Sequence, residues 1–85
     1  MSNASNYPGW KADEGYSGNL TTRCGDLAVV AYSEFTTEGV RYGFDVYDEA
    51  DEFGMMYGRW VYRLFGIWSM DATIDIAEAW LSENC

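Results

Sequence analysis

Residues 40–47 alternate between apolar and mostly polar side chains, and this alternation constrains the fold more than any other feature of the chain. One parity holds Val40, Tyr42, Phe44 and Val46. The other holds Arg41, Gly43, Asp45 and Tyr47. A period of two places the two sets on opposite faces of a β-strand, one covered and one in contact with water. The alternation therefore predicts an antiparallel sheet with one covered face.

Two further strands are predicted, one on each side of residues 40–47. Residues 26–35 are apolar on both parities, which is typical of a central strand. The connection 36–39 ends on Gly39, as short hairpin loops often do. The third predicted strand is residues 55–65, where aromatic and β-branched residues and Gly58 favour a strand over a helix. On it, Trp60 shares the apolar parity with Tyr62.

The end of the chain has the pattern of an amphipathic helix from about Asp71 to Glu83. Its apolar stripe is Ile74, Ala77 and Leu81, widened by Ile76 and Trp80. Ser69 or Asp71 is the expected N-cap. The predicted fold class is therefore α+β, a three-stranded antiparallel β-meander with one C-terminal α-helix packed on one face. Residues 1–25, rich in Gly, Asn, Ser and Thr, are expected to form an N-terminal arm before a single domain at residues 26–85.

The charge balance excludes several classes of function. The 85 residues include 14 acidic and 5 basic side chains and no His, for a net charge of −9. Basic residues are few and scattered, whereas a protein that binds nucleic acid directly has them clustered on one surface. The longest apolar run, 27–32, is too short to cross a membrane. Without His, and with two Cys, the common metal centres and His-based triads cannot form within one chain. We expect no enzymatic activity, cofactor or metal.

Five carboxylates lie within eight residues: Asp45, Asp48, Glu49, Asp51 and Glu52. One interpretation is a solvated connection that aids solubility. A calcium loop of the EF-hand type is excluded by the spacing. The other interpretation is recognition, in which carboxylates beside aromatic residues dock on a basic protein surface. The predicted partner-binding residues are Asp45, Tyr47, Asp48, Glu49, Asp51, Glu52, Phe53 and Tyr57. Basic grooves mostly belong to nucleic-acid-handling complexes, where such a protein would act as a DNA mimic.

The cysteines and tryptophans leave alternatives open. Residues 1–10 lack the features of a secretory signal, so a cytoplasmic location with free thiols is expected. In a secreted protein, Cys24 and Cys85 could instead form one bridge. Trp60 and Trp80 are expected in the core. The other two tryptophans, Trp10 and Trp68, are expected in a satellite apolar cluster or as exposed anchors for a partner.

The stretch from Val40 to Asn84, a hairpin or meander followed by the helix that begins near Ser69-Met70-Asp71, has the plan of many small phage proteins. With its size and acidity, the chain resembles phage-encoded anti-CRISPR inhibitors. That resemblance implies stoichiometric binding to a CRISPR effector in the cytoplasm of the host cell. It is a resemblance of plan, so no site residue is carried over. The alternatives are an immunity protein that neutralises a nuclease toxin, and a small homodimeric structural or assembly protein.

Overall fold

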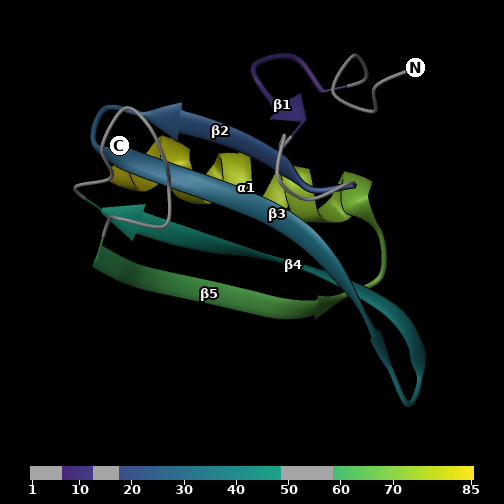
Figure 1. Ribbon diagram of the computed structural model, residues 1–85. Coiled ribbons are helices and arrows are strands. Elements are labelled where there is room, and N and C mark those ends of the chain that lie inside the picture. Colours follow the sequence, from purple (N-terminus) through teal and green to yellow (C-terminus); the bar gives the residue numbers. More distant parts are fainter. Residues whose placement is uncertain (1–6, 13–17, 49–58) are drawn as a thin grey trace.

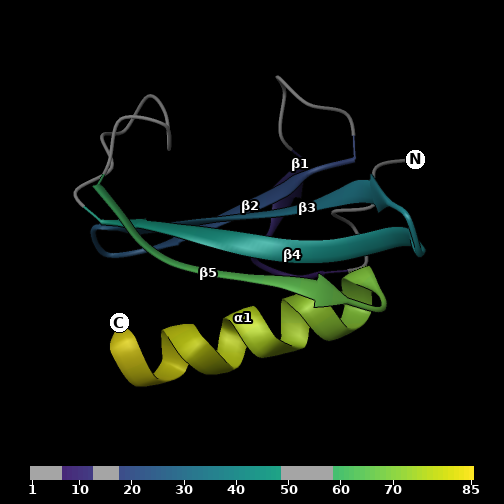
Figure 2. The same ribbon diagram turned by 90° about the horizontal axis from the view of Figure 1, so that it is seen from below.

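An antiparallel sheet with one helix on one of its faces makes up the described part of the chain, residues 7–12, 18–48 and 59–85 of the computed structural model (Figures 1 and 2). The strands are β1 (Lys11–Ala12), β2 (Leu20–Cys24), β3 (Leu27–Thr36), β4 (Gly39–Asp48) and β5 (Arg59–Ile67), and the helix is α1 (Met70–Asn84). Their order across the sheet is their order along the chain, and every neighbouring pair is antiparallel. The α+β class and the meander are thus as predicted.

The sheet has five strands, which corrects the prediction of three. The two additional strands, β1 and β2, come from residues 1–25, which were expected to form an arm. The apolar residues on both parities of β3 indicated a central strand, and β2 is the neighbour that this position requires. Leu20, opposite Ala31, is fully buried. The Gly, Asn, Ser and Thr content of residues 1–25 is typical of loops, and the five residues of β2 are too few to show a clear alternation.

The core lies between α1 and the face of the sheet that α1 covers. Phe44 and Val46 of β4 and Val29 of β3 are fully buried there, against Ile74, Ala77 and Leu81 of the helix. Trp10 joins this main core, so the expected satellite cluster is wrong for this residue. Its indole Nε1–H donates to Glu78 of α1 over 3.1 Å. The hydroxyl of Tyr7 likewise donates to Asp71, so residues 7–10 are anchored to the helix.

The helix boundaries agree with the prediction within one residue at each end. Ser69 is the N-cap, with extended backbone, and its Oγ accepts a hydrogen bond from the amide of Ala72 over 3.1 Å. At the other end, the amide of Cys85 donates to the carbonyl of Leu81 over 2.8 Å. No helix in the described ranges is both long and apolar enough to span a membrane.

A disulfide joins Cys24, at the end of β2, to Cys85, directly after α1. The two Cα atoms lie 6.0 Å apart, a usual separation for a disulfide. This bond corrects the expectation of free thiols. It ties the end of the helix to β2, a strand that the sequence pattern did not reveal. Disulfides persist mainly in oxidising compartments, so the bond does not favour the predicted cytoplasmic location, which stays a prediction.

The register between β4 and β5 shifts twice, and the shifts decide which face the β5 side chains occupy. Tyr62 pairs with Val46, but Trp60 pairs with Tyr47, because the register slips between Val46 and Tyr47. A bulge of this kind moves a side chain to the other face of a sheet. Trp60 is consequently 56% exposed, which corrects its predicted place in the core. The first residues of the predicted third strand, 55–58, lie outside the described residues.

Candidate interaction surfaces

The predicted partner-binding residues fall into two groups. Glu49, Asp51, Glu52, Phe53 and Tyr57 lie outside the described residues, so their role stays a prediction. The other three, Asp45, Tyr47 and Asp48, are at the end of β4. Their contacts show how the fold uses the start of the acidic cluster.

Asp45 is 7% exposed and lies on the face of the sheet opposite α1. Its carboxylate accepts two hydrogen bonds from the guanidinium of Arg63, over 2.9 Å and 3.1 Å. It also accepts one from the hydroxyl of Tyr32 over 3.2 Å. The hydrogen bond and charge of Asp45 raise the pKa of Arg63 above its ordinary value. This bidentate contact fixes the relative positions of the two side chains. Arg63 therefore neutralises the charge of Asp45 within the sheet.

Asp48 also faces a base across the β4–β5 pair. Its carboxylate lies 3.3 Å from a guanidinium nitrogen of Arg59, its register partner. The arginine is largely exposed, so the pair contributes less than about 1 kcal/mol to stability. Even so, substituting Asp48 would remove a contact between β4 and β5 as well as a surface charge.

Aromatic side chains surround the Asp45–Arg63 pair on this open face of the sheet. The rings of Tyr32 and Phe65 stack, with centroids 5.9 Å apart and planes at 11°. Gly43 lies between them in the register and leaves room for the stack. The guanidinium of Arg63 in turn lies 5.8 Å from the ring centroid of Trp60. The sequence pattern missed this arrangement because it depends on the β5 register.

The Tyr32 hydroxyl gives the open face a pH dependence. Burial, followed by the nearby Asp45 carboxylate, raises the pKa of Tyr32 to about 12. The folded state holds this proton more tightly than an ordinary phenol with a pKa near 10, so the contribution of the Tyr32 hydroxyl to stability is fully present below pH 10. That contribution is lost as the pH rises toward 12. We expect the melting temperature to fall over this range, and to fall less in Tyr32→Phe. An equal alkaline slope in both proteins would contradict this assignment.

A second surface lies at the end of the hairpin formed by β3 and β4, and we call it the tip patch: Phe35, Val40 and Trp68. Phe35 is 89% exposed and pairs across the hairpin with Val40, which is 36% exposed. Trp68, directly after β5, is 78% exposed. The guanidinium of Arg41 lies 4.4 Å from the centroid of the Trp68 ring. Arg41 also donates to the carbonyl of Val40 over 2.9 Å, which places Trp68 at the same end of the molecule as the hairpin residues. Exposed large apolar side chains that gather at one end of a fold are candidate interaction sites.

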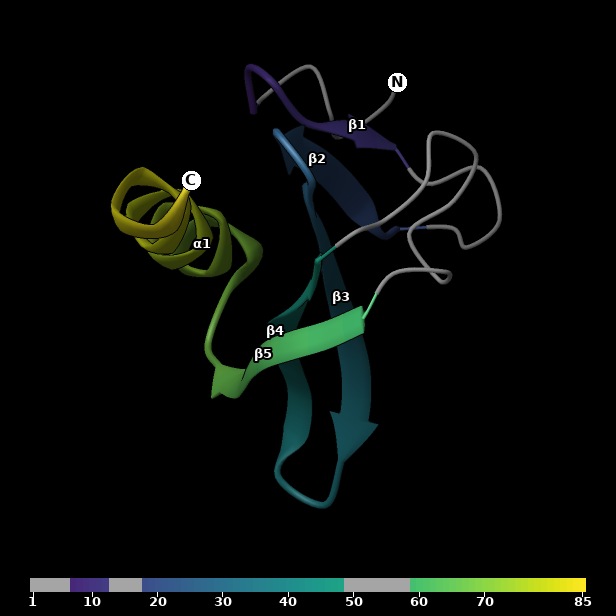
Figure 3. The same ribbon diagram turned by 90° about the vertical axis from the view of Figure 1, so that its left-hand side faces the viewer.

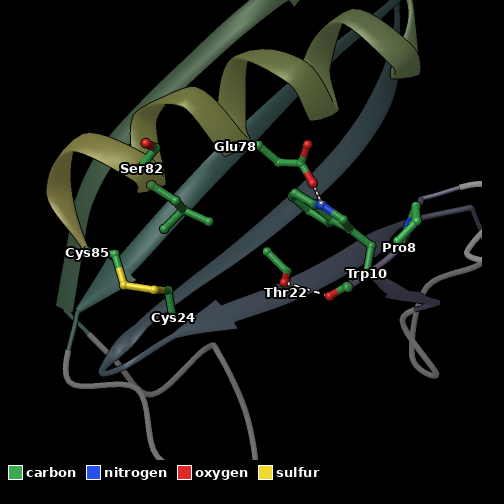
Figure 4. Close-up of a pocket in the computed structure, with 9 residues that line it drawn as sticks. Pro8, Trp10, Thr22, Cys24, Glu78, Ser82 and Cys85 are labelled. Carbon is green, nitrogen blue, oxygen red and sulfur yellow. Dashed lines mark hydrogen bonds between the residues drawn. A yellow bond between two sulfur atoms is a disulfide. The ribbon is translucent and has the colours of Figure 1, made fainter.

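A shallow pocket of about 430 Å³ lies where residues 8–10 meet the end of α1 (Figure 4). The disulfide borders it, and two of its polar side chains are engaged in hydrogen bonds. Glu78 accepts the hydrogen bond from Trp10, and the hydroxyl of Thr22 donates to the carbonyl of Gly9 over 2.7 Å. The hydrogen bonds around this pocket therefore hold residues 9 and 10 against the rest of the domain.

No protein-family model, curated protein or solved structure matches this chain. The resemblance to anti-CRISPR inhibitors consequently stays a hypothesis. Across residues 7–12, 18–48 and 59–85, no three metal-ligating side chains gather into a cluster. Among the described residues, the open face and the tip patch are two candidate interaction surfaces.

Proposed function

We propose that this protein is a non-enzymatic inhibitor that occupies a basic surface of a nucleic-acid-handling partner, in the manner of a DNA mimic. A CRISPR effector is the first candidate partner, and a nuclease toxin is the second. The partner is a protein complex, and the inhibitor itself does not contact nucleic acid.

The observation that carries this proposal is the uneven distribution of charge. Arg59 and Arg63 are paired with Asp48 and Asp45 on the sheet. Helix α1, by contrast, has no basic residue and exposes all four of its carboxylates: Asp71, Asp75, Glu78 and Glu83. The sequence adds Glu49, Asp51 and Glu52 in the acidic cluster. A net charge of −9 destabilises a small fold by self-repulsion, but it attracts a basic partner and speeds association.

A homodimeric assembly protein is the second candidate, and the tip patch is the observation that favours it. Two copies could bury Phe35 and Trp68 against each other. Size-exclusion chromatography with light scattering separates the two functions, because the inhibitor is expected to be a monomer of 9.6 kDa before it meets its partner. A stable dimer would favour the assembly protein.

Charge reversal in the acidic cluster tests the proposed function. Purified CRISPR effector complexes and nuclease toxins are each mixed with a labelled DNA duplex, and binding of the duplex is followed by gel mobility as the protein is added. We expect stoichiometric loss of DNA binding for one of these partners. The variant Glu49→Lys, Asp51→Lys, Glu52→Lys should weaken this inhibition tenfold or more, because it removes charge at the contact. Asp48 is kept, since it pairs with Arg59.

The comparison variant is Asp26→Lys, Asp75→Lys, Glu83→Lys, which makes the same change in net charge outside the cluster and includes two of the exposed carboxylates of α1. It should weaken inhibition less, because charges outside the contact act on the partner over longer distances, where salt screens them more strongly. If the control loses more than the cluster variant, the inhibitory contact lies away from the cluster. If no partner in the panel is inhibited, or if both variants inhibit as well as the wild type, the proposed function is wrong.

A further inference from the structure

We propose that the tip patch is an anchor that enters an apolar pocket bordered by basic side chains on the partner. This inference rests on the proposed function, because it names the contact by which a basic partner is held. It assigns the apolar part of that contact to Phe35, Val40 and Trp68, which the predicted set of partner-binding residues did not include.

The hairpin of β3 and β4 extends beyond both neighbouring strands. The pairing of β2 with β3 reaches only Ala31, and the pairing of β5 with β4 reaches only Tyr42. Phe35 and Val40 lie beyond these limits and pair only with each other. Figures 1 and 3 show the hairpin projecting past β5 and past the helix. An aromatic side chain at the end of such a projection can enter a concave surface.

The end of the hairpin is held in one conformation by its own turn. The hydroxyl of Thr36 donates to the carbonyl of Gly39 over 2.8 Å and accepts from the amide of Glu38 over 3.1 Å. Gly39 has a φ of +104°, a backbone angle that other residues rarely adopt. A turn fixed in this way presents Phe35 without a large ordering cost on binding.

The charges around the tip patch determine what kind of partner it fits. Glu34 and Glu38 flank Phe35 on the hairpin, and both are exposed. Asp71 follows Trp68 by three residues, at the start of α1. The nearby cation, Arg41, lies over the ring of Trp68. Around the apolar side chains, three carboxylates (Glu34, Glu38 and Asp71) outnumber the one cation, Arg41, which is the register partner of Glu34. The surroundings of the patch are therefore acidic on balance, which complements an apolar pocket with a basic border.

A second copy of the chain is a poorer fit for the same surface. Two tip patches facing each other would bring Glu34 and Glu38 of one copy toward those of the other. Like charges across an interface disfavour association, and each copy carries a net charge of −9. Charge complementarity therefore selects the basic partner.

Three synthetic peptides of about twelve residues test the chemistry of this surface. The first alternates Arg and Leu, the second Arg and Ser, and the third Glu and Leu. Each is titrated at low salt into the ¹⁵N-labelled full chain, and the amide and indole signals are followed by NMR. We expect the Arg–Leu peptide to bind more tightly than the other two. Its signal changes should centre on Phe35, Val40 and the indole of Trp68.

Two variants sharpen the test. Phe35→Ser should weaken binding of the Arg–Leu peptide about tenfold or more, as expected for an aromatic anchor. Val61→Ser is the matched control, because Val61 is an exposed apolar residue near the other end of β5. It should leave the affinity within about twofold of wild type, since a surface change away from the contact has little effect.

Each contrary result has a distinct meaning. If the Arg–Leu peptide binds but shifts signals away from the tip patch, or if Phe35→Ser binds it normally, the tip anchor is wrong and the proposed function stands. If tip signals move on dilution of the protein alone, the occupant is a second copy, and the inference is overturned. If neither Arg-containing peptide binds, the proposed function fails together with it.

Discussion

Reduction of the Cys24–Cys85 disulfide is expected to lower the free energy of unfolding by about 4 kcal/mol. The two cysteines are 61 positions apart, so the bond closes a loop over most of the chain. In the chain-entropy view, a loop of this length strongly restricts the unfolded state. A domain of this size has only a few kcal/mol of net stability, so we expect the reduced protein to be close to unfolding at 37 °C.

Urea unfolding followed by circular dichroism, with and without a phosphine reductant, measures this effect. The variant Cys24→Ser, Cys85→Ser should unfold at the same urea concentration as the reduced wild type. The reductant should not change the midpoint of that variant, which controls for side effects of the reagent. Equal midpoints for the oxidised and reduced wild type would contradict the structural role of the bond.

A side chain at Gly43 is expected to destabilise the fold by about 3 kcal/mol or more, as severe overpacking does. A Cβ built there would lie 2.5 Å from the carbonyl oxygen of Leu64 and 2.8 Å from Cδ1 of Phe65. The first contact is with backbone of the paired strand, which cannot move without breaking the sheet. Gly43→Ala should therefore lower the unfolding midpoint, and Gly43→Val should lower it further.

The matched control is Gly25→Asn. Gly25 has a φ of +60° and no atom within 4 Å of an added Cβ, and Asn tolerates this conformation better than most residues. Its unfolding free energy should change by less than about 1 kcal/mol. If Gly43→Ala unfolds at the wild-type urea concentration, the close approach of β5 to β4 is incorrect.

The elements with local signals were predictable from the sequence. β4 and β3 follow from side-chain periodicity, the turn before Gly39 from its glycine, and α1 from its apolar stripe and the capping residue Ser69. Each of these signals lies within about fifteen neighbouring residues. The class of fold and the covered face of the sheet therefore followed without tertiary information.

The features that depend on distant contacts were not predictable in the same way. β2 is stabilised by its pairing with β3, and its short pattern gave a weak signal. The exposure of Trp60 depends on a register slip that leaves no mark on a period-two pattern. The bond between Cys24 and Cys85 depends on where α1 ends in space. For all three, the deciding interaction is between residues far apart in the chain.

The same contrast between local signals and distant contacts applies to the candidate surfaces. The sequence located the acidic cluster, but it did not reveal that Arg63 and Arg59 neutralise Asp45 and Asp48 across the β4–β5 pair. It located the hairpin turn that Phe35 precedes. The projection of that turn depends on where β2 and β5 stop pairing, so the exposure of Phe35 became visible only in the fold.

The role of the surplus negative charge is tested most directly by the salt dependence of partner binding. The affinity of the full chain for the complex that it inhibits is measured without DNA, from about 0.05 M to about 0.3 M NaCl, a range over which surface charges become screened. If the acidic surface holds a basic partner, the affinity should fall at least tenfold across this range. An affinity that does not change with salt would contradict this mode of binding.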